Sequence, residues 1–400
     1  MENSPCESTA ERRRLTERDR RERKGSRIMN AAIIRTSSKS LTGIQSLRGM
    51  AAMLVVVAHI CLEIGKATSL DLSRLNILGG GGVDLFFVIS GFIMMYVCQR
   101  GGKPIGAMDF LGRRIIRIYP IYWFYTCVIL SMKALAIGYK SVGLSALYVT
   151  GSFLLVPAFR PDAISATIHP ILDQGWTLSY EMYFYLLFAV WIWAGMKRWF
   201  VLAGLPVFFL CVIAGARMLG SETSAFAHFL SKPIVFEFYF GVLIGWIFLK
   251  AKEPTDLVRN ACLALGALGF LAILWHGKSG DWRALTQGLP ASFLVFGFAY
   301  LEVGKRLAGR MLTELGDISY SLYLVHGFFT MTLGLVLKKA HLPGMAIVAL
   351  SLVTFGASVV AAWMSYRFLE RPVTSWLTKR WQEKRSYSRP VDLATSGAKE

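Results

Sequence analysis

The stretch QSLRGMAAMLVVVAHICLEI, residues 45–64, decides the fold class of this chain. It is an apolar run long enough to cross a bilayer as a helix, with one arginine near its start and one histidine deep inside. Charged and strongly polar side chains are costly in a bilayer, so Arg48 and His59 need a reason to be there. Helix geometry leaves the two side chains only about 20° apart around the axis and roughly 16 Å apart along it. One helix face therefore presents a cation near one end and an imidazole toward the other.

The composition extends this interpretation to the whole chain. Its 400 residues are 54% hydrophobic and the mean hydropathy is +0.47, which is typical of a multi-pass membrane protein. The net charge of +19 does not indicate nucleic-acid binding, because the basic residues lie in the tails and in short loops between apolar segments. The six cysteines form no CxxC pair, so the sequence predicts neither a zinc site nor a disulfide framework, and no metal is expected.

Ten apolar segments are expected to cross the membrane. The expected fold class is therefore all-α integral membrane, a bundle of about ten transmembrane helices. The segments lie at 45–64, 82–98, 115–136, 176–195, 199–216, 232–250, 258–276, 286–303, 316–337 and 345–368. The loop 137–175 contains the apolar stretch LSALYVTGSFLLVP, which is too short to span, so a re-entrant or interfacial segment is expected there.

The distribution of basic residues predicts the orientation of these segments. If the N-terminus is cytosolic, the segments on that side carry about three times as many Lys and Arg as the loops on the other side, as the positive-inside rule requires. Both termini are then cytosolic. The chain divides into a disordered basic cytosolic tail, 1–40, a transmembrane domain, 41–372, and a cytosolic C-terminal tail, 373–400.

This orientation assigns a depth to each polar residue and separates them into two layers. The layer on the cytosolic side is cationic and contains Arg48, Arg114 and Arg117. Arg114 and Arg117 are three positions apart, so they share one helix face. Guanidinium groups bind phosphates through bidentate hydrogen bonds, so this layer predicts a phosphate-bearing ligand. Arg113 and Arg114 could instead serve only as topology anchors at the membrane surface.

The layer toward the outer side combines imidazole, carboxylate and hydroxyl groups. Its members are His59, Asp84, Ser179, Glu181, Glu237 and His326. An imidazole beside a carboxylate is suited to removing a proton from a hydroxyl. Structural roles compete with this interpretation: His59 could hydrogen-bond between helices, Asp84 could brace the Gly-rich start of its helix, and Glu237 could pair with an arginine.

Six motifs, in order along the chain, resemble those of acyltransferase family 3, a family of integral-membrane O-acyltransferases. The motifs are LRGMAAMLVVVAH at 47–59, GGVDLFFVISGF at 81–92, FLGRRIIRIYPIYW at 110–123, WTLSYEMYFY at 176–185, GDISYSLYLVH at 316–326 and FLERP at 368–372. The resemblance covers nearly all of the chain outside its tails, and it is greatest to the exopolysaccharide-acetylating, ExoZ-like branch of the family.

The resemblance implies about ten transmembrane helices in the bacterial inner membrane and transfer of an acyl group, usually acetyl from acetyl-CoA, to hydroxyls of envelope or exported carbohydrates. The family positions regarded as essential fall here on Arg48, His59, Arg114 and Arg117, and further motif positions fall on Asp84 and Glu181. The implied partners are a carbohydrate or lipid-linked glycan acceptor, membrane lipid and polysaccharide-assembly proteins. Some members carry an extracytoplasmic SGNH esterase-like domain, which we do not expect here because the chain ends soon after the last span.

The predicted mechanism places the phosphates of acetyl-CoA on the cationic layer and its thioester near His59. His59, oriented by Glu181 or Asp84, removes the proton of the sugar hydroxyl, and a covalent acetyl-histidine remains an alternative route. Candidate contacts to the acceptor are Ser179, Glu237 and His326. The main alternative function is a proton-coupled transporter or flippase of an acyl- or glycan-linked substrate, because intramembrane His, Asp and Glu also serve proton transport. A membrane anchor or scaffold is a weaker alternative.

Overall fold

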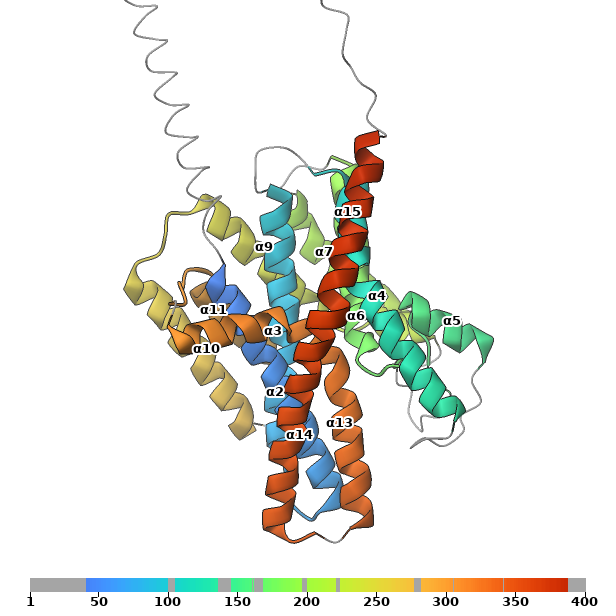
Figure 1. Ribbon diagram of the computed structural model, residues 1–400. Helices are drawn as coiled ribbons and strands as arrows, with labels where there is room; N and C mark the ends of the chain where they lie inside the picture. Colours follow the sequence, from blue (N-terminus) through green and yellow to red (C-terminus); the bar gives the residue numbers. More distant parts are fainter. Residues whose placement is uncertain are drawn as a thin grey trace, which may run out of the picture.

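The computed structural model describes residues 41–99, 105–135, 145–159, 161, 168–195, 200–220, 224–276, 282–304, 306–340 and 342–387. Throughout these ranges the regular elements are helices, as the hydropathy pattern predicts (Figure 1). The predicted N-terminal tail, 1–40, lies outside the described residues, and so does the last part of the predicted C-terminal tail.

Among the described residues, seven helices are long and apolar enough to cross a membrane, so the chain is a multi-pass membrane protein. These are α2 (Thr42–Ala67), α3 (Ser73–Gln99), α4 (Ala107–Ala134), η1 with α7 (Phe200–Gly204 and Leu205–Met218), α10 (Asp256–His276), α13 (Ser319–Lys339), and α14 (Gly344–Ser365) with its continuation. The other three predicted segments form helices that are shorter or more polar, namely α6 (Gly175–Trp193), α9 (Val235–Lys250), and η3 with α11 (Ala284–Gly288 and Leu289–Ala299). The count of ten spans therefore stays a prediction.

Helices α2 and α3 form the centre of the bundle, with α13 and the short α12 (Leu307–Asp317) packed on α2 and with α9 packed on α3 (Figure 1). Glycines allow the α3–α9 contact to be this close. A Cβ atom at Gly91 would lie 2.1 Å from the carbonyl oxygen of Phe238, and one at Gly241 would lie 2.0 Å from the carbonyl oxygen of Val88. Small residues at helix contacts are the usual means of close packing in membranes.

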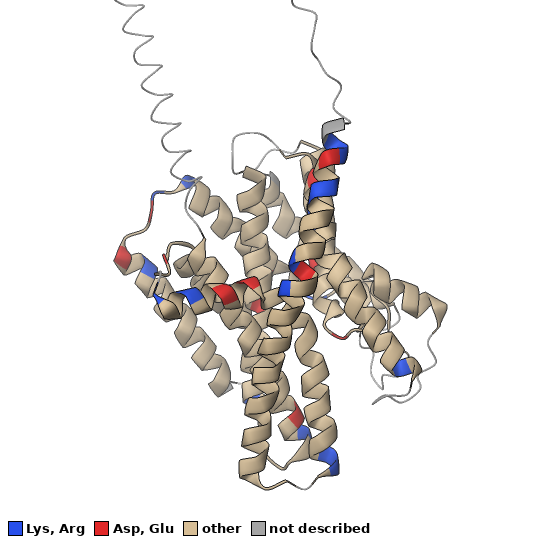
Figure 2. Ribbon diagram, in the orientation of Figure 1, with Lys and Arg blue, Asp and Glu red and all other residues tan. Residues whose placement is uncertain are grey.

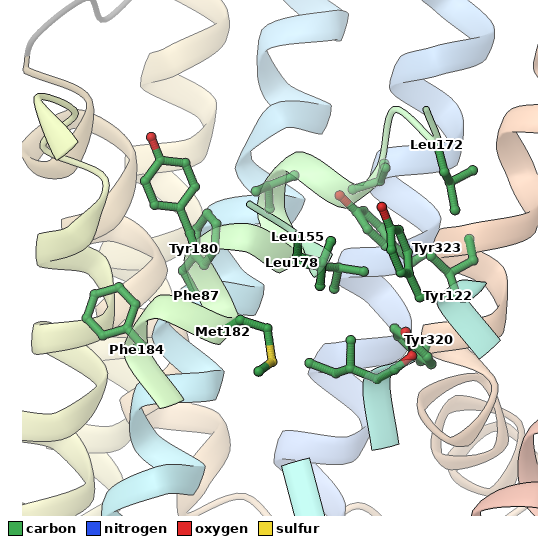
Figure 3. Packing of buried hydrophobic residues seen from close by; sticks show 14 of the residues in the cluster. Phe87, Tyr122, Leu155, Leu172, Leu178, Tyr180, Met182, Phe184, Tyr320 and Tyr323 are labelled. Atoms are coloured by element: carbon green, nitrogen blue, oxygen red, sulfur yellow. Dashed lines mark hydrogen bonds between the residues drawn. The ribbon is translucent and has the colours of Figure 1, made fainter. Parts of the chain in front are cut away.

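Aromatic side chains fill the space between α3, α6 and α9. Phe184 of α6 stacks on Phe238 of α9 with ring centroids 3.6 Å apart. Phe87 of α3 meets Tyr180 of α6 edge to face, at 6.2 Å, within the cluster drawn in Figure 3. These contacts hold α6 against the centre of the bundle, and α6 is the helix that carries Glu181.

A short helix, α5 (Ala146–Leu154), lies beside α4 within the predicted 137–175 loop (Figure 1). Its last carbonyls accept hydrogen bonds from Tyr119, Tyr122 and Trp123 of α4, at 3.0, 2.7 and 2.9 Å. These bonds satisfy the carbonyl groups that a helix end leaves without intrahelical partners. With nine residues α5 is too short to span a bilayer, as expected for a re-entrant or interfacial segment.

The C-terminal region continues α14 without a break. A π-helical turn, η4 (Tyr366–Glu370), leads directly into α15 (Arg371–Tyr387), so the predicted tail 373–400 begins as a helix. Helix α2 starts in the upper half of Figure 1, α15 ends at its top, and the α13–α14 turn lies at the bottom. Both ends of the described chain therefore lie above the α13–α14 turn in this view.

Candidate functional site

A cavity of about 470 Å³ lies between α2, α3, α4, α6 and α13. Most of its lining is apolar, including Phe86, Phe87 and Ile93 of α3. Four of the predicted site residues also line it, namely Arg48, Arg114, Arg117 and Glu181. Such a cavity, apolar with a few charged groups, is the usual form of a small-molecule site.

Arg48 joins α2 to the start of α13 at this cavity. Its Nη1 donates to Oε1 of Gln45 at 3.2 Å, and its Nη2 donates to Oγ of Ser319 at 3.0 Å. Both partners are neutral, and no carboxylate of the described residues lies within ion-pair distance of the guanidinium. Two neutral partners therefore hold the guanidinium of Arg48 in place.

Arg114 and Arg117 project from α4 into the same cavity, as their spacing predicts. Arg114 is only 8% exposed, and its guanidinium lies 5.4 Å from the ring centroid of Phe110 and 5.3 Å from that of Tyr185. These are cation–π contacts, which orient a cation but leave its charge available. Like Arg48, both arginines lack an ion pair within the described part of the chain, so three arginines without a carboxylate at ion-pair distance line one cavity.

Glu181 lies among these arginines. The membrane depth predicted for it from the sequence would instead place it beside His59. Its Oε1 accepts hydrogen bonds from Oγ of Ser90, at 3.0 Å, and from the hydroxyl of Tyr185. The difference arises because α6 begins beside the middle of α4 rather than beside one of its ends. Its first residue, Gly175, packs against the hydroxyl of Tyr122, which lies midway along α4. A depth predicted on the assumption that α6 begins at the outer membrane surface therefore places Glu181 too far from the arginines.

His59 and His326 lie together beyond the cavity, on α2 and α13. Their ring centroids are 4.9 Å apart with an interplanar angle of 68°. Nδ1 of His59 is 2.8 Å from the carbonyl oxygen of Val55, and Nδ1 of His326 is 3.1 Å from that of Leu322. A carbonyl oxygen only accepts, so in each neutral ring Nδ1 carries the hydrogen and Nε2 has the free lone pair. His326 is fully buried, and its Nε2 has no hydrogen-bond partner in the described structure.

The predicted carboxylate partner of His59 is not present in this geometry. Glu181 bonds to Ser90 and Tyr185, and Asp84 bonds to an arginine elsewhere, so a backbone carbonyl rather than a carboxylate orients the His59 ring. Tyr323 connects the histidines to the cavity, because it lines the cavity and its ring centroid lies 6.0 Å from that of His326. Its hydroxyl pairs with Oγ1 of Thr177 at 2.7 Å.

Asp84 and Glu237 form a separate buried cluster with Arg283, away from the cavity. Arg283 binds Asp84 in a bidentate pair, with Nε–Oδ1 and Nη2–Oδ2 distances of 2.9 and 3.0 Å. Oε1 of Glu237 lies 3.9 Å from Nε of the same guanidinium, and both carboxylates are fully buried. Glu237 thus matches the structural alternative of pairing with an arginine. Arg283 is not among the predicted site residues, because in the sequence it resembles an ordinary loop cation.

Ser179, a predicted acceptor contact, is buried and lies outside the cavity lining. Its hydroxyl donates to the carbonyl of Gly175 at 3.2 Å, one turn earlier in α6. This is a local helix contact, and nothing in the geometry distinguishes it from an ordinary serine in a membrane helix.

Comparison with known sequences identifies the family. Residues 41–366 match the family described as an acyltransferase domain, Acyl_transf_3. The chain belongs to acyltransferase family 3. The match includes every element that lines the cavity and carries the histidine pair, and it ends at the start of η4. Family membership makes the protein a membrane acyltransferase and disfavours the transporter, flippase and anchor alternatives.

Individual proteins that this chain resembles also include acyltransferases. The exopolysaccharide production protein ExoZ of Rhizobium meliloti is 34% identical over 297 residues, which cover 74% of this chain and 90% of ExoZ. The acyltransferase MdmB of Streptomyces mycarofaciens is 25% identical, over 85% of this chain and 92% of MdmB. The O-acetyltransferase OatA of Staphylococcus aureus is 23% identical over 84% of this chain and 58% of OatA. No solved structure matches the chain.

Proposed function

We propose that this protein is an O-acetyltransferase of the bacterial inner membrane. It moves acetyl from cytosolic acetyl-CoA to a hydroxyl of an envelope or exported carbohydrate. The observation that carries the proposal is the cavity lined by Arg48, Arg114 and Arg117, none of which forms an ion pair within the described chain. Cations in a membrane domain are retained when they serve a ligand, and guanidinium groups suit phosphates. The names of the relatives ExoZ and OatA support a carbohydrate acceptor and an acetyl group.

The donor is held at its phosphates and directed toward the histidines. The arginines bind the phosphates of acetyl-CoA, and the apolar α3 side of the cavity, including Phe86, accommodates the pantetheine arm. Tyr323 lies between this cavity and His326, so the thioester approaches the histidine pair past the Tyr323 side chain. With both termini and the arginines on the cytosolic side, donor and acceptor arrive from opposite faces of the membrane.

The chemical step uses the free lone pair on Nε2 of His59. Nε2 takes the proton of the sugar hydroxyl while the hydroxyl oxygen attacks the thioester carbonyl carbon. The carbon–sulfur bond breaks, and the CoA thiolate leaves and recovers the proton from Nε2. In the covalent alternative, Nε2 attacks the thioester carbonyl carbon and the CoA thiolate leaves. The sugar hydroxyl oxygen then attacks the acetyl carbon, the bond from that carbon to Nε2 breaks, and the hydroxyl proton passes to the thiolate. Both routes need the same nitrogen, which the bond from Nδ1 to Val55 leaves free.

Acetyl-CoA binding by purified arginine variants tests the donor site. Arg114→Ala and Arg117→Ala each remove a charge-assisted bond to phosphate, so each should weaken binding about tenfold or more. Arg117→Lys should recover binding only in part because it loses the planar fork. Arg113→Ala is the matched control, since Arg113 is half-exposed and paired with Asp109 at 3.3 Å. Wild-type affinity in the Arg114→Ala/Arg117→Ala double variant would overturn the donor assignment.

A further inference from the structure

Helix α15 begins after residue 366, where the match to the family model ends, yet it is attached to the site at both of its ends. Its first attachment is to α13. Glu370, immediately before α15, accepts a hydrogen bond from Oγ of Ser321 at 2.6 Å, and Ser321 also pairs with Ser365 at 3.0 Å. Ser321 lies two residues after Ser319, the partner of Arg48. The start of α15 is therefore fixed to the helix that forms one wall of the cavity.

The second attachment is to the N-terminal end of α4. The ring of Trp381 lies so close to Gly112 that a Cβ atom there would come within 2.4 Å of it. Nε1 of Trp381 donates to Oδ1 of Asp109 at 3.3 Å, and Nη1 of Arg385 lies 3.5 Å from the same oxygen. The Arg385 guanidinium in turn lies 5.7 Å from the Trp381 ring centroid. A tryptophan, a glycine and an ion pair therefore form one specific helix–helix contact.

This contact adjoins the arginine pair. Gly112 precedes Arg114 by two residues, so the Trp381 ring packs on the turn of α4 from which Arg114 projects. On another face of the same turns, Arg114 packs against Tyr185 of α6. The end of α4 is thus held from one side by α6 and from another by α15. Figure 2 shows the basic and acidic residues of α15 gathered toward its far end, where this contact is made.

We propose that α15 is a brace that holds the first turns of α4, and with them Arg114 and Arg117, in position to bind the donor. Trp381 is the positioning residue, because it makes the contact on Gly112. The inference rests on the proposed binding of acetyl-CoA at the arginines. It adds that residues outside the family's domain determine how strongly this chain holds its donor.

The test compares tryptophan variants of the full chain for acetyl-CoA affinity and for KM and kcat. Trp381→Ala removes the ring, so the α4 end moves and both Kd and KM for acetyl-CoA should rise about fivefold or more, with kcat little changed. Trp381→Phe keeps a ring against Gly112 and should restore most of the affinity. Trp376→Ala is the matched control, because Trp376 lies on the same helix but is 59% exposed, and it should behave as wild type.

A substitution on the α4 side of the Trp381–Gly112 contact tests the proposal independently if the Trp381→Ala variant does not fold. Gly112→Ala adds one methyl group where the ring sits and favours the helical state of α4, so it should displace α15 without unfolding α4. It should raise Kd as Trp381→Ala does, and the two effects should not add.

The outcomes separate the two proposals. Wild-type Kd in both Trp381→Ala and Gly112→Ala, with weakened binding in Arg117→Ala, overturns the brace and leaves the donor site standing. Wild-type Kd in the arginine variants overturns the donor site, and the brace is overturned with it. Equal loss in Trp381→Ala and Trp381→Phe also contradicts the proposal, because a ring at this position would then not be what holds α4.

Discussion

The two imidazoles owe their chemical state to backbone carbonyls one helical turn earlier. His59 bonds to Val55 and His326 to Leu322, each through Nδ1. This arrangement needs no carboxylate to fix the tautomer, and it leaves Nε2 of both rings as the acceptor. The sequence suggested Asp84 or Glu181 as the orienting group because carboxylates commonly take that role. A helix carbonyl does the same and leaves no trace in the sequence.

His59→Gln distinguishes a base from a packing residue. Glutamine can form hydrogen bonds but cannot accept the hydroxyl proton, so acetyl transfer should fall by at least about 100-fold. Acetyl-CoA affinity and the melting temperature should stay close to wild type, because the arginines proposed to bind the donor are not altered. Activity, affinity and melting temperature should be measured on the same preparation, with His59→Ala alongside.

The opposite profile would assign His59 to packing. In that case His59→Gln keeps near-normal transfer, while His59→Ala loses thermal stability more than activity. The free Nε2 of His326, one ring away at 4.9 Å between centroids, would then become the base to test.

At the scale of elements, one partly buried guanidinium ties α3, α9 and the start of η3 together. Arg283 lies just before η3, Asp84 is on α3 and Glu237 is on α9. Gly288 allows the close approach, since a Cβ atom there would lie 2.7 Å from Cγ of Glu237. The cluster fixes α3, whose residues form the apolar side of the arginine-lined cavity. We therefore expect the cluster to hold helices in position rather than to contact substrate.

Arg283→Met should therefore destabilise the protein strongly. It leaves two buried carboxylates without a cation, which costs about 3–5 kcal/mol when a buried pair is broken. The triple variant Arg283→Met/Asp84→Asn/Glu237→Gln removes the charges together and should recover much of the lost melting temperature. Arg259→Met is the control, because its ion pair with Asp256, at 2.8 Å, has a carboxylate that is 84% exposed. Exposed pairs of this kind contribute about 0–1 kcal/mol.

Equal melting temperatures for Arg283→Met and Arg259→Met would contradict the structural role of the cluster. If Arg283→Met instead kept its stability and lost transfer, Asp84 would return to the list of residues that act on the substrate. Thermal unfolding in detergent, read together with acetyl transfer, separates these cases.

At the scale of the whole molecule, the sequence predicts features that depend on local residue patterns. It does not predict features that depend on where each helix begins relative to its neighbours. Hydropathy predicts the membrane class, and the spacing of Arg114 and Arg117 predicts that they share a face with access to one site. Glu181 is misplaced because depth counted along the chain assumes that every span starts at the surface, and α6 starts midway along α4. Arg283 and the docking of α15 depend on contacts between residues far apart in the chain, which a single sequence does not reveal.

The orientation of the whole bundle in the membrane can be tested by labelling the two ends of α4. Its 28 residues extend about 42 Å, more than the bilayer's hydrocarbon core of about 30 Å, so its ends lie on opposite faces. Met108 and Leu135, near the two ends, are 62% and 70% exposed. In a background without native cysteines, Leu135→Cys should react with an impermeant thiol reagent in intact cells. Met108→Cys should react only after permeabilisation, because the positive-inside rule puts that end in the cytosol. The reverse pattern would place the arginine cavity on the outer side, out of reach of cytosolic acetyl-CoA, and the donor assignment would have to be abandoned.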